Sequence, residues 1–137
     1  MKKYAMVFDA GTGAGRCNLF DMSGRLVSYA YREWEYLKDL SSSNKEAMLF
    51  DAEQFKKILF SLCRKVITQA GISADEIVAV SATSQREGMV WLDRFGKEIY
   101  AAPSVDLRGE EAADILSGKE PFIKEITGSV SYTHLTL

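Results

Sequence analysis

The feature that most constrains the fold is a glycine-rich stretch near the start of the chain, VFDAGTGAGR over residues 7–16. An apolar run leads into it and a second one follows almost at once, which predicts a tight hairpin between two strands. Backbone with so few Cβ atoms can direct several N–H groups toward one oxyanion. The carboxylate of Asp9 can hold a divalent metal, and the guanidinium of Arg16 can neutralise phosphate. The stretch therefore predicts a phosphate-binding hairpin.

Three apolar runs in the first 34 residues predict neighbouring strands, at residues 4–9, 17–21 and 26–34. Their short connections favour an antiparallel meander. The first run is almost continuously apolar, which is typical of a strand buried on both faces. A polar loop is expected after the meander, over residues 37–48.

An amphipathic helix is predicted next. Asp51 has the features of an N-cap, with Gln54 three residues later to complete a capping box, and Gly71 ends the pattern. Between these ends, apolar residues recur at spacings of three and four: Phe55, Ile58, Leu59, Leu62, Val66 and Ala70. The basic side chains of the helix fall mostly on its other faces, as expected of a solvated surface.

A second buried-type strand is predicted at residues 77–82, parallel to the first because a helix separates the two. It ends in a polar cluster, residues 83–88. The rest of the chain predicts a hairpin and two short helices, with strands at 89–92 and 97–101 and helices at 110–116 and 121–127. This order favours an α/β fold with a mixed sheet, and it lacks the regular alternation of a dinucleotide-binding fold.

Composition excludes several classes of function. With 137 residues, 47% of them hydrophobic, and a net charge of −2, the chain is typical of one globular domain without general attraction to nucleic acid or anionic membranes. No apolar run approaches the roughly 20 residues of a membrane span. Cys17 and Cys63 lack metal-site spacing, so two buried, reduced thiols in a cytoplasmic protein are expected.

The glycine stretch does not match two better-known phosphate motifs. It lacks the Gly-Lys-Ser/Thr ending of a P-loop and the helix that must follow a dinucleotide fingerprint. Phosphate would therefore be held by turn amides and side chains. The alternative is a hairpin rich in glycine for its backbone alone. Asp9 and Arg16 at its two ends favour the phosphate site.

The spacing Asp-x-Gly-Thr-x-x-x-Arg over residues 9–16 resembles the first phosphate motif of the FGGY carbohydrate kinases. The likeness continues in the same order through residues 81–88, Trp91-Leu92-Asp93, Gly96, Asp106-x-Arg108 and Ile126-Thr127-Gly128. The resemblance implies a ribonuclease-H-like fold, shared with actin, hexokinase and the heat-shock ATPases. It implies that residues 1–129 form the family's N-terminal domain, incomplete at its C-terminus. Within the family, DAGTG, SATSQREGMV and VDLR are most similar to the segments of the autoinducer-2 kinases.

The resemblance also implies a role for each matched residue of the hairpin. Asp9 would lie near the ATP phosphates and their Mg²⁺, and so is the expected metal-binding residue. Gly11 and Thr12 would form the turn over the β- and γ-phosphates, and Arg16 would hold the transferring group. Many family members carry hydroxyl side chains where this chain has Gly13 and the alanine after it. Gly13 is therefore expected to offer its backbone N–H to the nucleotide.

Two further segments resemble the parts of these kinases that bind the sugar or polyol. Gln85, Arg86 and Glu87 match the first, and Asp106 with Arg108 matches the second. A carboxylate that accepts and a guanidinium that donates hydrogen bonds suit a polyhydroxylated ligand. Glycerol kinases carry Arg-Glu in the first segment and xylulokinases Met-His. The alternatives are a surface ion pair at Arg86 and Glu87, and a helix-start charge at Arg108.

The implied activity is transfer of the γ-phosphate of ATP to a hydroxyl of a small sugar, polyol or autoinducer-2-like substrate, with Mg²⁺. The catalytic base, the adenosine segment and the second kinase domain come later in the family pattern. No catalytic residue is therefore assigned, and the isolated chain is expected not to turn over. Residues 130–137 match no family pattern and are expected to be a non-native tail, so the histidine within them is given no role.

Other interpretations of the sequence remain open. The chain is compatible with a non-catalytic remnant of the fold, or with an ATP-driven conformational protein of the actin and heat-shock ATPase superfamily. The strand-end segment at Gln85 favours the kinase over the ATP-driven protein, whereas a true end of the gene at residue 137 would favour the remnant. A homo-oligomer of the full-length protein is compatible with everything in the sequence.

Overall fold

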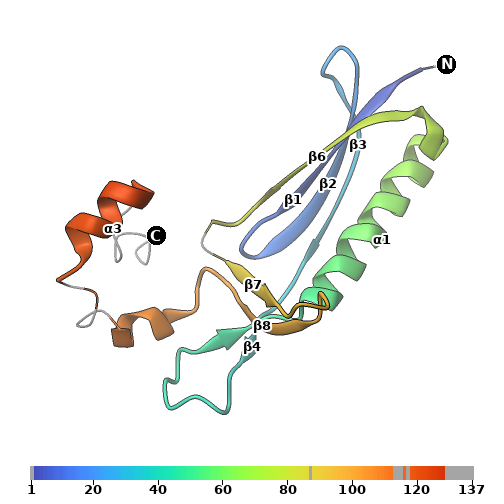
Figure 1. Ribbon diagram of the computed structural model, residues 1–137. Coiled ribbons are helices and arrows are strands. Elements are labelled where there is room, and N and C mark those ends of the chain that lie inside the picture. The colour runs from blue at the N-terminus through green and yellow to red at the C-terminus, as the bar shows by residue number, and fades with distance from the viewer. Residues whose placement is uncertain (1, 87, 113–115, 117, 129–137) are drawn as a thin grey trace.

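The centre of the fold is a four-stranded mixed sheet with the strand order β3-β2-β1-β6 (Figure 1). β1 (Tyr4–Ala10), β2 (Ala14–Asp21) and β3 (Leu26–Glu33) form the predicted antiparallel meander. β6 (Ile77–Ser84) pairs with β1 in parallel, as predicted from the helix that separates them. β2 begins three residues earlier than the sequence predicted, because the small residues after the glycine turn already pair with β1 and β3.

The structure, a computed structural model, describes residues 2–86, 88–112, 116 and 118–128. Glu87 and the predicted tail at 130–137 lie outside the described residues. Within the described part of the chain, no helix combines the length and the apolar character that crossing a membrane requires.

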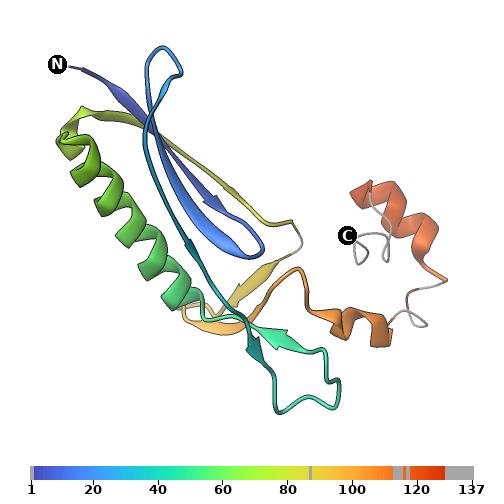
Figure 2. The ribbon, with the colours of Figure 1, turned by 180° about the vertical axis from the view of Figure 1, so that it is seen from behind.

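One long helix, α1 (Ala52–Ala70), covers one face of the sheet and packs on β2 and β3 (Figures 1 and 2). Its N-cap is Asp51, whose carboxylate accepts a hydrogen bond of 2.8 Å from the backbone N–H of Gln54. Gly71 ends the helix in the left-handed conformation, at a φ of 64°. Both ends lie where the sequence predicted. The apolar stripe buries four side chains, each worth roughly 1.5–3 kcal/mol: Phe55, Ile58, Leu62 and Val66.

The hydrophobic core lies between α1 and the meander. Alternate side chains of the first two strands enter it: Tyr4, Met6, Cys17 and Leu19. The residues between them on β1 are only half-buried, so the prediction of a strand buried on both faces is wrong, because α1 covers one face alone. Burial raises the pKa of the Cys17 thiol to about 12, which keeps it protonated. Cys63 is half-buried, and both cysteines are free.

β6 differs most from its prediction. The sequence predicts a buried strand, but Val78 and Val80 are 50% and 63% exposed, and every residue of β6 after Ile77 is exposed. The physical reason is that β6 pairs with β1 on one side only, and β1 is the one described element with which it makes extensive contact. The apolar sequence of β6 is therefore that of a strand suited to burial in a larger assembly.

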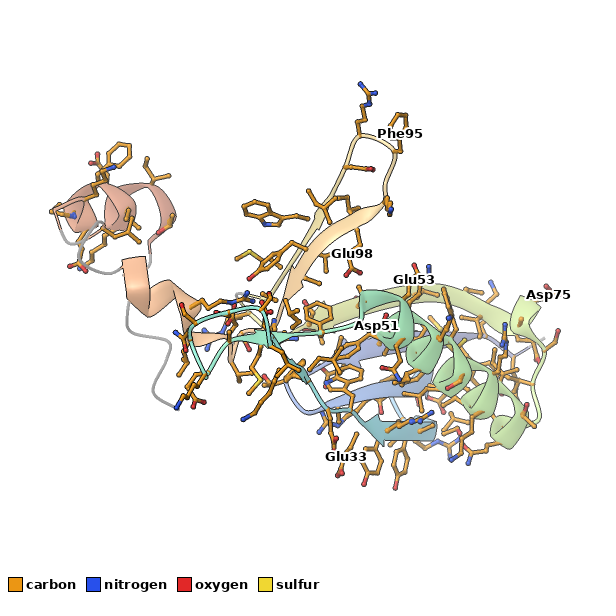
Figure 3. The ribbon with its side chains drawn as sticks, turned by 90° about the horizontal axis from the view of Figure 1, so that it is seen from below. Glu33, Asp51, Glu53, Asp75, Phe95 and Glu98 are labelled. Atoms are coloured by element: carbon orange, nitrogen blue, oxygen red, sulfur yellow. The ribbon has the colours of Figure 1, made fainter. Side chains whose placement is uncertain are left out.

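Two small hairpins flank the central sheet. The predicted loop at 37–48 is closed by a pair of two-residue strands, β4 (Leu37–Lys38) and β5 (Met48–Leu49). β7 (Met89–Leu92) and β8 (Glu98–Ala102) form the second predicted hairpin. Figure 3 shows Phe95 at its tip, pointing away from the sheet, and this ring is 78% exposed.

The end of the described chain leaves the sheet. The predicted helix at 110–116 is instead, over its first residues, a 3₁₀ helix that begins earlier, η2 (Leu107–Ala112). α3 (Glu120–Thr127) is the second predicted helix, and Gly128 ends it at a φ of 71°. Figures 1 and 2 show α3 apart from the sheet and from α1.

Candidate active site

The glycine stretch forms a tight hairpin. β1 and β2 are joined by three residues, and the backbone N–H of Gly11 donates to the carbonyl of Ala14 at 2.9 Å. None of its glycines has a positive φ, so unusual backbone angles are not the reason for them. At Gly15 a Cβ atom would lie 2.5 Å from the ring of Trp34, whereas at Gly13 it would meet nothing within 4 Å. Gly15 is needed for close packing, and Gly13 leaves open space beside the turn.

Asp9 and Arg16 lie directly opposite each other on β1 and β2. Arg16 Nη1 is 2.9 Å from Asp9 Oδ2, and the two side chains are 52% and 31% exposed. An ion pair this open to solvent contributes about 0–1 kcal/mol to stability. A bound nucleotide and its metal can therefore compete for both partners at low cost. The strand register explains why residues seven apart in the sequence share one site.

The residues at the hairpin fit a magnesium nucleotide. Mg²⁺ keeps several waters and takes one or two carboxylates together with substrate phosphates. Asp9 supplies one such carboxylate beside the exposed turn. In the described chain, no group of three or more His, Cys, Asp or Glu residues could hold a metal by itself. A single carboxylate beside an open turn suits an ion that arrives with phosphate oxygens.

Two aromatic residues that the sequence analysis did not assign to the site hold the turn. Trp34 Nε1 donates to the Thr12 carbonyl at 3.1 Å, and the backbone N–H of Trp34 donates to the Gly13 carbonyl at 3.1 Å. The hydroxyl of Tyr36 donates to the same Thr12 carbonyl. Since both rings pack near Phe55, the turn is fixed to the core. In the sequence, the signal for these two residues is that they lie two positions apart directly after β3.

The polar segment after β6 lies beside the hairpin. The backbone N–H of Gln85 donates to the Ala10 carbonyl at 2.8 Å, so the end of β6 lies against the end of β1. The side-chain oxygen Oε1 of Gln85 accepts from both the N–H and the hydroxyl of Ser104, at 3.0 and 2.7 Å. The side-chain oxygen of Gln85 therefore holds Ser104 in place. Arg86 is exposed, and Glu87 lies outside the described residues.

Asp106 and Arg108 form the centre of a half-buried ion network. Arg108 Nε lies 3.0 Å from both oxygens of Asp106, Nη1 is 2.7 Å from Asp39, and Nη2 donates to the Met48 carbonyl at 3.0 Å. The guanidinium also lies 5.1 Å from the centre of the Tyr100 ring. The network fastens η2 to the loop between β4 and β5 and to β8.

The charges of this network hold one another in the ionised state. Burial opposes ionisation of Asp106, but hydrogen bonds from Arg108 and from the Met48 backbone outweigh it and lower the pKa of Asp106. The hydrogen bond to Asp106 raises the pKa of Arg108. The hydrogen bonds of Ser41 are the main reason that the pKa of Asp39 is lowered. Both predicted members of the substrate segment are thus engaged within the protein.

A pocket of about 430 Å³ lies between the start of α1, the ends of β1 and β6, and β7. Its walls are mostly aromatic and aliphatic, with Ser84, Gln85 and Lys56 as polar members. The pocket reaches the Gln85 segment but does not include Asp9 or Arg16. An apolar wall of this kind can hold the carbon skeleton of a ligand or side chains of the protein, while its polar groups fix orientation.

Two solved structures of carbohydrate kinases share this arrangement. A gluconate kinase from Lactobacillus acidophilus matches 98% of this chain with a TM-score of 0.75, at 18% identity and over 26% of its own length. Glycerol kinase from Plasmodium falciparum, solved with ADP, matches 97% of this chain with a TM-score of 0.76, at 22% identity and over 27% of its own length. These likenesses confirm the predicted actin- and hexokinase-like fold class.

The sequence itself matches the N-terminal domain of the FGGY family of carbohydrate kinases over residues 4–137, and the chain belongs to this family. It is 39% identical over 107 residues to the autoinducer-2 kinase of Yersinia enterocolitica, a match that covers 77% of this chain and 20% of that protein. The autoinducer-2 kinase of Salmonella typhimurium is 37% identical over 107 residues, 77% of this chain and 19% of that protein. The chain spans about a fifth of the length of these curated relatives.

Proposed function

We propose that the chain is the N-terminal part of a longer, cytoplasmic kinase that transfers the γ-phosphate of ATP to a hydroxyl of a small polyhydroxylated substrate. The observation that carries this proposal is the contact between its two polar segments. The Gln85 backbone bonds the Ala10 carbonyl at 2.8 Å, which sets the proposed acceptor segment beside the proposed phosphate hairpin. Phosphoryl transfer needs these two groups held close together and little covalent chemistry from the protein.

In this proposal the hairpin holds the nucleotide phosphates. Thr12 and Gly13 offer backbone N–H groups at an exposed turn, which Gly11 closes through its own bond to the Ala14 carbonyl, and Arg16 neutralises charge on the transferring group. Asp9 provides one oxygen to Mg²⁺, which supplies charge neutralisation at the phosphates when bound. The open Asp9–Arg16 pair supports these roles, because both charges can exchange partners.

The acceptor segment is proposed to act through the residues that remain available to a ligand. Gln85 uses its oxygen within the protein, so its amide N–H groups are the atoms proposed to donate to substrate. Arg86 is exposed beside it, and Glu87 completes the proposed set. Asp106 and Arg108, which do not line the 430 Å³ pocket, are proposed to support the acceptor side of the site through the network that holds η2 in place.

The substrate class is proposed from the most similar relatives. Proteins named autoinducer-2 kinases share 37–39% identity with this chain, and an autoinducer-2-like linear polyol is therefore the first acceptor to test. The exposed apolar strand β6 supports the presence of further chain in the active protein. The catalytic base and the adenosine site are proposed to lie in that further chain, and residues 1–129 to be the part of the first domain that this chain contains.

The test is ADP release by the full-length protein against a panel of polyols, ketoses and autoinducer-2-type acceptors. The proposal predicts ATP turnover that depends on one class of acceptor, and a thermal shift with that acceptor that Arg86→Ala abolishes. ATP hydrolysis that ignores every acceptor would instead indicate an ATP-driven conformational protein. An unchanged thermal shift in Arg86→Ala would remove the acceptor segment from the proposal.

A further inference from the structure

Tyr36 lies between the two halves of the candidate site. It follows β3, and its half-buried ring packs between Phe50 and Phe55, with centroid distances of 6.3 and 5.9 Å. Its hydroxyl contacts the Thr12 carbonyl at the hairpin turn and also Gln85 Oε1, at 3.4 Å. One hydroxyl group therefore contacts both the phosphate hairpin and the acceptor segment.

The direction of these hydrogen bonds follows from the neighbouring groups. A carbonyl oxygen can only accept, so the Tyr36 hydroxyl is the donor to Thr12. The Gln85 atom facing Tyr36 must be the oxygen, because it also accepts from the backbone N–H of Ser104. The hydroxyl has one proton, which it donates mainly to the Thr12 carbonyl. Its contact of 3.4 Å with Gln85 is therefore the weaker of the two. Burial raises the pKa of Tyr36, which keeps this proton in place.

We propose that Tyr36 is a positioning residue that, together with the backbone bond from Gln85 to the Ala10 carbonyl, sets the spacing between the phosphate hairpin and the acceptor segment. The contacts of the hydroxyl support the link between the two segments. The expected effect of this link on turnover rests on the proposed kinase function. Trp34 holds the same carbonyl but makes no hydrogen bond to Gln85 among the described residues, so it fixes the hairpin without linking the segments. Loss of the Tyr36 hydroxyl leaves the hairpin folded but lets the distance between the hairpin and the acceptor segment vary. Alignment of the reacting groups depends on that distance.

The test uses the full-length kinase with the single substitution Tyr36→Phe, which removes the hydroxyl and keeps the ring. Tyr31→Phe is the matched control, because Tyr31 is an exposed tyrosine on β3, 53% accessible, with no hydrogen bond from its hydroxyl in the described chain. The first measurement is amide hydrogen exchange at Gly11 and Ser104, whose N–H groups bond within the hairpin and to Gln85 Oε1.

Tyr36→Phe should raise exchange at both amides by about three- to tenfold, while exchange in α1 and in Tyr31→Phe stays unchanged. Faster exchange at only one of the two amides, or at neither, would overturn the link. This measurement needs no turnover, so it decides the link even if the panel of acceptors reveals no kinase activity and the proposed function fails.

The second measurement separates positioning from a purely structural role. With an active wild type, Tyr36→Phe should lower kcat about tenfold and change KM for ATP by less than about twofold, because alignment is lost while nucleotide binding is kept. A structural role alone would lower the apparent Tm and leave kcat per folded enzyme unchanged. That result, or a kcat equal to that of Tyr31→Phe, would overturn the positioning role.

Discussion

The molecule contains two groups of opposite charges that the sequence singles out alike, and they are built differently. Asp9 and Arg16 make one contact across two strands, and the arginine is 52% exposed. Arg108 is 20% exposed and uses Nε, Nη1 and Nη2 to bond Asp106, Asp39 and a backbone carbonyl. The first pair has donor capacity left for a ligand, and the second has its nitrogen atoms committed to the protein.

This difference assigns ligand binding to the Asp9–Arg16 pair and support of the fold to the Arg108 network. A charge with few partners and open solvent can exchange them for a phosphate at low cost. A half-buried charge that loses one partner leaves the others unsatisfied, so the network resists such exchange. We therefore expect substitutions at the hairpin pair to change turnover, and substitutions at the Arg108 network to change stability first.

The largest effect is expected at the hairpin pair. Arg16→Ala in the full-length kinase should lower kcat by about 10²–10³-fold, because a charge that stabilises the transferring group is lost. The apparent Tm should fall little, since the exposed pair contributes at most about 1 kcal/mol. Steady-state kinetics and thermal unfolding check this. Arg25→Ala, which breaks the exposed pair with Asp21, is the control and should leave kcat unchanged. A kcat equal to that of the wild type in Arg16→Ala would contradict the assignment of ligand binding to the hairpin pair.

The next prediction concerns the support of the hairpin. Gly15→Ala should destabilise the protein by about 2–3 kcal/mol, because the new Cβ would lie 2.5 Å from the Trp34 ring in a packed region. Gly13→Ala is the matched control, with nothing within 4 Å of the added atom. Its stability should stay within about 0.5 kcal/mol of wild type. Equal loss in both variants, measured as apparent Tm, would show that packing does not fix the hairpin.

At the second charge group we expect a loss of stability. Arg108→Ala should destabilise the protein by about 2 kcal/mol, because hydrogen bonds from a charged donor to Asp106, Asp39 and the Met48 carbonyl are lost together. The KM for the acceptor should rise as the support of the acceptor side of the site loosens. Arg94→Ala, at an exposed arginine over the Phe95 ring, provides the surface control. A stable Arg108→Ala enzyme with a greatly reduced kcat would reverse the roles of the two charge groups.

The smallest effect is expected with acid. The pKa of Asp106 is lowered in the folded protein, so its ionised form stabilises the fold above the ordinary aspartate pKa of about 3.9. That stabilisation is lost as the pH falls through the lowered folded pKa. The difference in apparent Tm between wild type and Asp106→Asn should therefore be constant near neutral pH and shrink below about pH 4. A gap that stays the same down to pH 3 would contradict the ionic character of the network.

Much of the fold could be predicted from the sequence, because local signals decide it. The meander, the N-cap at Asp51 and the end of α1 at Gly71 all follow from patterns within a few residues. The exposure of β6 could not be predicted, since the sequence of an apolar strand is the same whether or not another element covers it. The early 3₁₀ helix at Leu107 depends on the network of Arg108, which no local pattern contains.

The sequence names candidate residues for the site but not the contacts between them. Asp9 and Arg16 stand out by chemical type, and the strand register then places them face to face. The bond between Arg108 and Asp39 joins residues 69 apart, and sequence spacing carries no information on such pairs. Tyr36 was missed for the same reason, because its partners Thr12 and Gln85 lie 24 and 49 residues away in the sequence.

The central claim is that these residues hold one half of a kinase site, with the base and adenosine pocket supplied by further chain. The most direct measurement is acceptor-dependent ADP release by two proteins side by side, the 137-residue chain and the full-length protein. The account predicts turnover by the full-length protein with a polyhydroxylated acceptor and none by the 137-residue chain. Robust phosphorylation of an acceptor by the short chain, or no acceptor-dependent turnover by the full-length protein, would contradict it.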